Sequence, residues 1–436
     1  MKIAFHTLGC KVNQFDTAVM EEQVREADHE IVASDGLADV HVINSCSVTE
    51  NSDREAKRLI GRLKRKDPRA RIVVTGCYAQ THPEDLRRNP QIDVILGNSH
   101  KGKLSDYLCT INDSEGPVLA VGSEFSCDPL VQPLIRGLRG HTRSFIKVQD
   151  GCDFDCSFCL IPRARGPGRS LPVERVIEQV SRLVEEDCQE VVLTGINLGT
   201  YGRDFSPKES LGSLLQMVIE RTPIRRVRLS SLEPKTVTSH LRDVIASSSR
   251  ICRHFHVPLQ SGDDQILLAM NRHYSAGFYQ DLILELKGQF PDAGFGTDVM
   301  VGFPGETDEQ FSRTFTLLNR LPMAYFHVFP YSHRPDTLSP QLNGPVDEKE
   351  ITIRADRLRR LSAVKLSMFL EAQLGRQTEV LFEKERDVRT GLLKGLSDNY
   401  ARVFLRGSDC LKNTIVPVRF KKTDGKNLEG EILQNS

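Results

Sequence analysis

Three cysteines lie close together in the segment GCDFDCSFCLIP, as Cys152, Cys156 and Cys159. Thiolates at C-x3-C-x2-C spacing, on a loop that leaves a strand, can each bind a different iron of a cubane cluster. A [4Fe–4S] cluster needs four ligands, so three cysteines leave one iron with an open position, as a catalytic metal requires. The alternatives are a zinc site that lacks its fourth ligand and a group of reactive thiols. The motifs that surround the segment favour the catalytic cluster.

Three further cysteines each follow directly on a strand-like run. Cys10 ends KIAFHTLGC, Cys46 ends ADVHVINSC and Cys77 ends RIVVTGC. The separations of 36 and 31 residues are each about one β-α-β repeat. Ends of parallel strands lie side by side at one edge of a sheet, where α/β sheets usually bind ligands. We therefore expect a second metal site here; the alternative is three buried structural cysteines.

The other five of the eleven cysteines show no paired spacing. We expect them to be ordinary core or surface thiols: Cys109, Cys127, Cys188, Cys252 and Cys410. The first strand-like run is followed at once by polar sequence, which does not resemble a signal peptide, and no run of about 18 apolar residues occurs. We therefore expect a cytoplasmic protein without a membrane segment, and in a reducing cytosol cysteines serve better as metal ligands than as disulfides.

The elements that must position these cysteines are those of an α/β protein. Residues 1–115 alternate compact β-rich runs, such as ADVHVIN and RIVVTG, with amphipathic ones. Between those two runs, Ser52 and Glu55 could form a capping box, and Asp67 before a proline ends the helix. Apolar residues lie between them at helical spacing: Ala56, Leu59, Ile60 and Leu63. This β-α-β pattern predicts an N-terminal domain with a parallel sheet.

The middle segment, 140–370, repeats the strand–helix unit six times. The strands are expected near 144–149, 190–194, 226–229, 254–258, 294–301 and 324–329. An eight-unit barrel takes about 250 residues, so a partial, open (β/α)6 barrel is the better prediction. Residues 116–139 are rich in glycine and proline and are expected to be a linker, and 371–436 predict a small β-barrel.

Polar motifs follow the second to fourth strands of this predicted barrel, as TGIN, SSLEP and VPLQSG, and the fifth strand carries TDVMVGFPGET. Active sites of β/α barrels lie at the face where the strands end. A turn or a helix cap can explain each motif alone, but together they lie beside the Cys152 loop. The candidate cofactor-binding residues are Gly195, Asn197, Ser231, Glu233, Gln260, Ser261, Asp298 and Gly305.

The cysteine loop at the end of the first barrel strand resembles the signature of the radical S-adenosylmethionine (SAM) superfamily. The resemblance implies that the amino and carboxylate groups of SAM chelate the open iron. Reduction then cleaves SAM into methionine and a 5′-deoxyadenosyl radical. It also implies that Gly195, Ser231 with Glu233, and the Gly305 loop surround SAM.

Over almost the whole chain, the three predicted domains resemble the methylthiotransferases of that superfamily. The resemblance implies two [4Fe–4S] clusters, one on each cysteine triad, with SAM as the further cofactor. The cluster on Cys10, Cys46 and Cys77 holds, or is, the sulfur donor. One SAM methylates that sulfur, and a second gives the radical that removes hydrogen from the substrate carbon. An external electron donor and a sulfur donor are implied as partners.

In that family the terminal domain, called TRAM, contacts RNA. Here residues 371–436 contain 12 Lys and Arg against 10 Asp and Glu, and the whole chain has a formal net charge of +0. RNA binding must therefore use local basic patches, although a solvated charged surface would look the same. The candidate phosphate contacts are Arg163, Arg165, Arg169, Lys421 and Lys422.

The phrase LGCKVNQFDT (8–17) resembles the branch that modifies N6-threonylcarbamoyladenosine beside the tRNA anticodon. The expected reaction is therefore methylthiolation of C2 of that adenosine, with the tRNA anticodon loop as partner. Two alternatives keep the chemistry and change the substrate to isopentenyladenosine of tRNA or to an aspartate of a ribosomal protein. A third is a non-enzymatic iron–sulfur RNA-binding protein, which would explain the clusters and the β domain but not the polar motifs.

Overall fold

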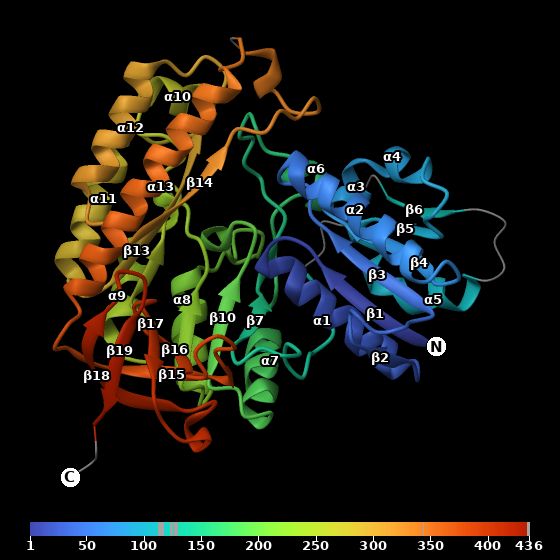
Figure 1. Cartoon of the computed structure of the whole chain (residues 1–436), viewed down its shortest axis with the longest axis horizontal. Helices are drawn as coiled ribbons and strands as arrows, with labels where there is room; N and C mark the ends of the chain where they lie inside the picture. The colour runs from blue at the N-terminus through green and yellow to red at the C-terminus, as the bar shows by residue number, and fades with distance from the viewer. Residues whose placement is uncertain (112–116, 123–124, 126–129, 343, 434–436) are drawn as a thin grey trace.

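The computed structural model describes residues 1–111, 117–122, 125, 130–342 and 344–433. Figure 1 shows three parts: an N-terminal α/β domain, a central half-open barrel and a small C-terminal β-barrel beneath it. None of the helices within those residues is both long and apolar enough to cross a membrane.

The N-terminal domain is built on a six-stranded, wholly parallel sheet. In spatial order its strands are β2 (Glu30–Val32), β1 (Lys2–Thr7), β3 (Val40–Ser45), β4 (Arg71–Gly76), β5 (Val94–Leu96) and β6 (Val118–Ala120). Its helices are α1 (Lys11–Glu26), α2 (Glu50–Lys66), α3 (Cys77–Thr81), α4 (Pro83–Arg87) and α5 (Leu104–Thr110). Apolar residues of α1 and α5 cover one face of the sheet, and those of α2 and α4 cover the other.

Two details of this domain differ from the predictions. Strand β6 is the edge strand of the sheet, so the domain extends beyond residue 115 into the predicted linker. The N-cap of α2 is Thr49, whose side chain accepts a hydrogen bond from the Ser52 amide, so the capping box at Ser52 and Glu55 is wrong. The apolar face of α2 and its end at Asp67 are as predicted.

The central segment forms the predicted partial (β/α)6 barrel. Its parallel strands are β7 (Ser144–Lys147), β10 (Glu190–Thr194), β11 (Arg226–Leu229), β12 (His254–His256), β13 (Gly294–Val301) and β14 (Tyr325–Pro330). The first three and the last three form separate ladders, joined by a parallel bridge between Val227 and Ile251. One continuous apolar core lies between these strands and their helices.

The helices of this segment are α7 (Val173–Glu185), α8 (Leu211–Arg221), α9 (Ser239–Ser247), α10 (Asp264–Ala269), α11 (Ala276–Gln289), α12 (Asp308–Arg320) and α13 (Glu348–Glu371). A short ribbon of β8 (Gln149–Asp150) and β9 (Arg169–Ser170) encloses the cysteine loop and α6 (Ile161–Arg165).

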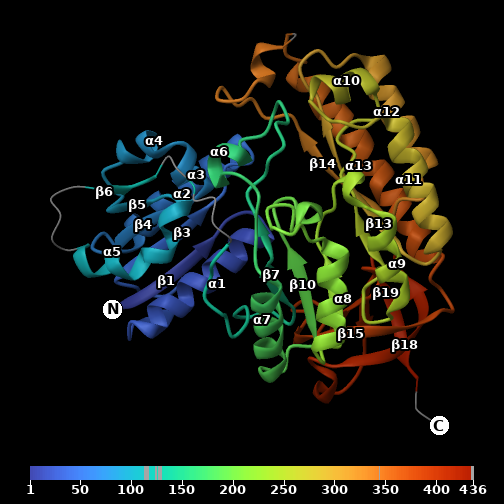
Figure 2. The same cartoon turned by 180° about the vertical axis from the view of Figure 1, so that it is seen from behind.

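The C-terminal domain is a closed five-stranded barrel, as predicted. Its strands, in spatial order, are β15 (Gln377–Arg386), β16 (Leu393–Ser397), β17 (Arg402–Leu405), β19 (Leu428–Ile432) and β18 (Ile415–Thr423). Figure 2 shows it against the lower end of the central barrel, where β10 begins.

A buried ion-pair group joins the two barrels. Glu190, fully buried at the start of β10, pairs with Arg226 and Arg228 at the start of β11. Both arginines also donate to backbone carbonyls of the C-terminal barrel, including that of Leu396. Burial alone would raise the pKa of Glu190, but Arg228 and Arg226 lower it to about 2. The small barrel is thus fixed at the end of the strands opposite to the one that carries the cysteine loop.

Candidate active site

The first cysteine triad lies on the loop between β8 and α6, where β7 has ended. Cys152, Cys156 and Cys159 are each partly buried. Backbone amides point at their sulfurs: the Phe154 amide lies 3.4 Å from Cys152 Sγ, and the Ile161 amide lies 3.5 Å from Cys159 Sγ. Burial raises the pKa of Cys159 to about 12. Amide donors around partly buried sulfurs suit thiolates held by metal rather than free thiols.

Two side chains from other loops complete this first site. Arg272 places Nη1 3.3 Å from Cys156 Sγ, and its Nη2 pairs with the carboxylate of Glu233. Asn197 places Nδ2 3.8 Å from Cys152 Sγ, while its buried Oδ1 has no partner among the described residues. An unpartnered buried oxygen beside the cysteines is what an amine or hydroxyl of a cofactor would satisfy. Sequence reasoning missed Arg272, since a single arginine after α10 carries no spacing signal.

The second triad gathers at the carboxyl edge of the N-terminal sheet, as predicted. Cys10 caps α1, Cys46 follows β3, and Cys77 begins α3. A Cβ added at Gly9 would lie 2.6 Å from Cys46 Cβ and 2.8 Å from its Sγ, so Cys46 packs directly on the backbone next to Cys10. Burial, and then the neighbouring thiols of Cys77 and Cys10, raise the pKa of Cys46 to about 11. The three thiols are therefore neighbours at one edge of the sheet, as a shared metal cluster requires.

Both triads open onto the same cavity, which has a volume of about 210 Å³. Cys77 of the second triad and Cys159 of the first are in its wall. The rest of the lining is mainly apolar and comes from both domains: Val48, Phe158, Leu160, Ile161, Ala164, Met300, Phe329, Pro330 and Tyr331, with Ser47, Thr49, Gln260, Asp298 and Ser332. A group in this cavity can reach chemistry at either triad.

Asp298 forms a polar wall of the cavity. His256 Nε2 lies 2.9 Å and His327 Nδ1 3.1 Å from the same oxygen of Asp298. Burial would raise the pKa of Asp298, but the two histidine hydrogen bonds lower it well below its ordinary range. Gln260, beside it, adopts a left-handed backbone conformation with φ of +66°. The predicted residues Asp298 and Gln260 thus both line the cavity. The sequence analysis did not single out the two histidines that hold Asp298.

The remaining predicted cofactor residues have different surroundings. Ser261 is fully buried and its hydroxyl lies 3.3 Å from that of Thr314 in α12, so it is unavailable to a cofactor and this prediction is wrong. Gly195 packs against Gln149, where a Cβ would lie 2.8 Å from the amide oxygen. Ser231 is exposed after β11, and Gly305 lies in the turn after β13 with φ of +79°. Their roles stay predictions.

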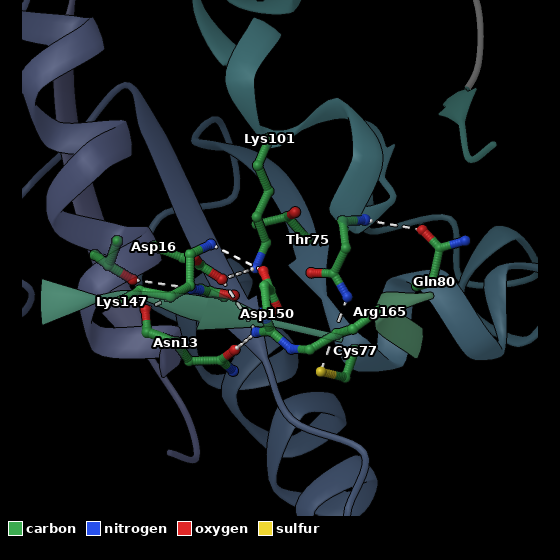
Figure 3. Close-up of polar contacts among 12 residues, drawn as sticks. Asn13, Asp16, Thr75, Cys77, Gln80, Lys101, Lys147, Asp150 and Arg165 are labelled. Atoms are coloured by element: carbon green, nitrogen blue, oxygen red, sulfur yellow. Dashed lines mark hydrogen bonds and ion pairs between the residues drawn. The ribbon is translucent and has the colours of Figure 1, made fainter. Parts of the chain in front are cut away.

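A buried ionic network holds the two cysteine-bearing domains together (Figure 3). Arg165 donates to both oxygens of Asp150, at 2.9 and 3.1 Å, and to Asp16 at 3.0 Å. Lys147 contacts Asp16 at 2.6 Å and Asp150 at 2.9 Å, and Lys101 contacts Asp16 at 2.9 Å. Asp16 and Lys101 belong to the N-terminal domain and the others to the barrel. The prediction that Arg165 contacts RNA is wrong, because its side chain is 2% exposed and both of its terminal nitrogens already pair with buried acidic or amide groups.

This network has three cations for two carboxylates, and its excess positive charge faces the second triad. Burial opposes the charge of Arg165, but Asp150, then Cys77, Asp16 and Cys10, raise its pKa well above the ordinary value. Thiolates bound to iron would carry negative charge at that position. The network therefore fits a metal cluster on the second triad.

A second interdomain ion pair lies near residues that line the cavity. Arg334, after β14, lies 2.5 Å from Asp53 of α2 and donates to the carbonyl of Ser47 at 3.0 Å. The amide of Glu50 donates to the hydroxyl of Ser332. Two separate polar contacts thus join the pair of domains that together line the cavity.

The other predicted RNA contacts lie on the surface or near it. Arg163 is exposed and pairs with Asp336 at 3.1 Å. Arg169 is half-buried with its guanidinium over the ring of Phe125. In the C-terminal barrel, Lys421 pairs with Glu431 at 2.7 Å, and Lys422 is exposed. These four assignments stay predictions.

The remaining cysteines fit ordinary thiols. Cys188 and Cys252 are buried, and Cys109 and Cys410 are exposed. Cys127 lies outside the described residues.

Two family models match the chain. Residues 2–97 match the model described as "Uncharacterized protein family UPF0004", and residues 146–318 match that of the radical SAM superfamily. The two matches cover the two domains that carry the cysteine triads.

Curated relatives are similar to this chain over nearly its full length. A protein of Bacillus subtilis named threonylcarbamoyladenosine tRNA methylthiotransferase MtaB is 34% identical, over 99% of this chain and 96% of its own. A protein of the same name from Aquifex aeolicus is 37% identical, over 89% and 95%. A tRNA-2-methylthio-N(6)-dimethylallyladenosine synthase of Pelotomaculum thermopropionicum is 30% identical, over 98% and 96%.

Among solved structures, the fold is similar to that of TsrM from Kitasatospora setae, a radical SAM methyltransferase solved with cobalamin and a [4Fe–4S] cluster. The TM-score is 0.58 at 15% identity, over 78% of this chain and 76% of that one. This likeness supports the arrangement of an α/β domain on a partial barrel.

Proposed function

This chain belongs to the family of radical SAM tRNA methylthiotransferases, and we propose that it adds a methylthio group to C2 of N6-threonylcarbamoyladenosine next to the tRNA anticodon. The relatives that carry this substrate in their names are 32–37% identical to the chain. Those named for dimethylallyladenosine are 29–32% identical, so isopentenyladenosine is the less favoured substrate. Both groups of relatives are named for tRNA, so an aspartate of a ribosomal protein is not favoured either.

The observation that carries the proposal is the cavity whose lining includes both Cys77 and Cys159, one cysteine from each triad. Methylthiolation of an unactivated carbon needs a radical source and a sulfur source that reach the same atom. A fold with one metal site, or with two sites that open onto different surfaces, would not meet that need.

We assign one [4Fe–4S] cluster to each triad and SAM to the open iron of the cluster on Cys152, Cys156 and Cys159. When bound, these groups supply one-electron chemistry, which a carbon–hydrogen bond without an acidic proton requires. The unpartnered Oδ1 of Asn197 and the carboxylate of Glu233 offer acceptors for the amine or ribose of SAM.

The chain's own residues bind and orient the substrate and exclude water. The apolar lining of the cavity, with Phe158 and Met300, suits the faces of an adenine, while Gln260 and Asp298 offer polar contacts at one side. A base enters such a cavity only if it leaves its stack, which single-stranded loops of RNA permit. We propose accordingly that the partner is the tRNA anticodon loop, that the C-terminal barrel (371–436) acts as a TRAM domain, and that the enzyme works in the cytoplasm with an external electron donor and a sulfur donor.

The test uses anaerobically reconstituted enzyme and anticodon stem-loop RNAs that differ in one adenosine. One carries N6-threonylcarbamoyladenosine, one isopentenyladenosine and one plain adenosine, and products are read as nucleosides by mass spectrometry. We expect methylthio product from the first alone, and none from Cys156→Ala. Product from the second RNA alone would replace the substrate, and SAM that stays intact under strong reductant would favour a non-enzymatic iron–sulfur RNA-binding protein.

A further inference from the structure

Helix α2 carries an unusually basic surface for a chain without net charge. Its 17 residues, Glu50–Lys66, include seven Lys and Arg against three Asp and Glu. One face packs on the sheet through Ala56, Leu59, Ile60 and Leu63. The opposite face is exposed and carries the basic residues Arg54, Lys57, Arg58, Arg62, Arg65 and Lys66.

Three of these arginines have no counter-charge among the described residues. In the part of the chain that the structure describes, Arg58, Arg62 and Arg65 make no ion pair and no side-chain hydrogen bond. By contrast, Arg54 pairs with Glu50 at 2.6 Å, and Lys57 lies 3.9 Å from Asp85. Residues at positions i, i+4 and i+7 lie along one side of a helix. The three guanidinium groups therefore form a stripe of uncompensated positive charge.

Nearby groups respond to this charge. His6 and His41 lie under the same helix, with ring nitrogens 3.0 Å apart. Burial lowers the pKa of His6 to about 4, and His41, Arg62 and Lys66 add to the effect. The exposed face of α2 is thus positively charged, and a polyanion such as an RNA backbone is complementary to it.

The helix that carries the stripe begins at the cavity that is to receive the base. Thr49, the N-cap of α2, lines the cavity together with Ser47 and Val48. At 1.5 Å per residue, Arg58 lies about 14 Å and Arg65 about 24 Å along the axis from that point. A strand whose base occupies the cavity has its neighbouring phosphates within that range.

We infer that the Arg58–Arg62–Arg65 stripe of α2 binds the phosphate backbone of the tRNA whose modified base enters the cavity. The inference rests on the proposed function, and it names the surface by which the RNA is held. Guanidinium groups suit this role because they bind phosphate oxygens through two parallel hydrogen bonds.

The basic residues of the C-terminal barrel offer a useful contrast. Several are already paired, as Lys421 is with Glu431, Lys412 with Asp409 and Arg386 with Asp409. That barrel also lies at the opposite end of the central strands from the cysteine loop. The α2 stripe is on a helix that begins at the cavity and lacks such partners in the described part of the chain, so it is the better site for phosphates near the reacting nucleotide.

The test compares two double variants that remove the same charge. Arg58→Gln with Arg62→Gln changes the stripe. Arg320→Gln with Arg360→Gln changes two exposed arginines on α12 and α13, without ion pairs in the described structure, on the other side of the molecule (Figure 1). Binding of a fluorescent anticodon stem-loop with N6-threonylcarbamoyladenosine is measured by anisotropy over a range of salt concentrations, on enzyme that holds its clusters.

We expect the α2 variant to bind roughly 10-fold or more weakly at low salt, and its plot of log Kd against log salt concentration to be less steep by about two. The control variant keeps the parent's affinity and slope. Both variants cleave SAM at the parent's rate without RNA, which shows intact clusters.

Equal RNA affinity and slope in parent and α2 variant would overturn the inference and leave the proposed function standing. If RNA affinity is equal but a protein electron donor reduces the clusters of the α2 variant more slowly than those of the parent, the stripe binds that donor instead. Failure of the parent itself to bind the RNA would overturn both the inference and the proposed function.

Discussion

Arg272 joins the cysteine loop to the loop after β11: its Nη1 lies 3.3 Å from Cys156 Sγ, and its Nη2 pairs with Glu233. The side chain of Arg272 is almost fully buried, and its guanidinium lies over the ring of Tyr274. One side chain thus sets the position of a cluster ligand and of a carboxylate expected to contact SAM.

Replacing Arg272 by Gln should weaken SAM binding and slow its reductive cleavage. Hydrogen bonds to charged groups are worth about 1.5–3 kcal/mol each, so the expected loss is roughly 10- to 100-fold. The measurements are the Kd for SAM, the yield of 5′-deoxyadenosine and the electron paramagnetic resonance spectrum of the reduced cluster. Arg203→Gln serves as control, because Arg203 is exposed and lines the same surface pocket as Arg272 and Glu233. A variant with unchanged Kd, yield and spectrum would show that Arg272 only packs there.

The two triads should load with iron independently. Cys46→Ala and Cys156→Ala should each retain about half of the iron and sulfide of the parent, because each triad holds one four-iron cluster. Only Cys46→Ala should still cleave SAM. Cys410→Ser, at an exposed cysteine outside both triads, should keep the full iron content. Loss of all iron in either alanine variant would contradict separate sites.

Replacing Arg165 by Met should destabilise the junction between the cysteine-bearing domains. Asp16 and Asp150 would remain buried with less compensation, and breaking a buried pair costs about 3–5 kcal/mol. We expect a lower urea midpoint by circular dichroism and faster loss of iron from the second triad. Arg163→Met, at an exposed neighbour, should change the midpoint little. Equal midpoints for the two variants would mean that the network contributes no stability.

Glu190 should make the docking of the C-terminal barrel sensitive to acid. Its pKa is about 2 in the folded protein against an ordinary 4.5, so its stabilising effect is present above that ordinary value and is lost as the pH falls from about 4.5 to about 2.

Glu190→Gln should therefore lower the urea midpoint strongly at neutral pH, and the difference from the parent should shrink within that window. The exposed Glu186→Gln provides the comparison, and because the parent and both variants are measured together, acid loss of the clusters affects all three. A difference that stays constant with pH would contradict a charged Glu190.

Sequence reasoning predicted the cysteine triads and the strands that carry them because these features are local or repeat with a fixed period. The end of a parallel strand identifies an edge of the sheet, so Cys10, Cys46 and Cys77 could be grouped without knowing any contact. Gln260 was found for the same reason, as a polar residue after a strand, and Asp298 as the charged residue within the strand Gly294–Val301.

Features that depend on distant partners could not be predicted in this way. Arg165 belongs to a basic loop in the sequence, and only the folded chain brings it to Asp16, 149 residues away. Ser261 has the right residue type at a strand end, but α12 packs over it. Strand β6 is three residues long and half exposed, so it lacks the apolar pattern that marked the inner strands.

The measurement that tests the central claim most directly is nucleoside mass spectrometry on tRNA from cells with and without this gene. We predict that the methylthio form of N6-threonylcarbamoyladenosine disappears without the gene, that the unthiolated nucleoside accumulates, and that a Cys156→Ala copy does not restore the product. Unchanged tRNA in cells that lack the gene would contradict the proposed function.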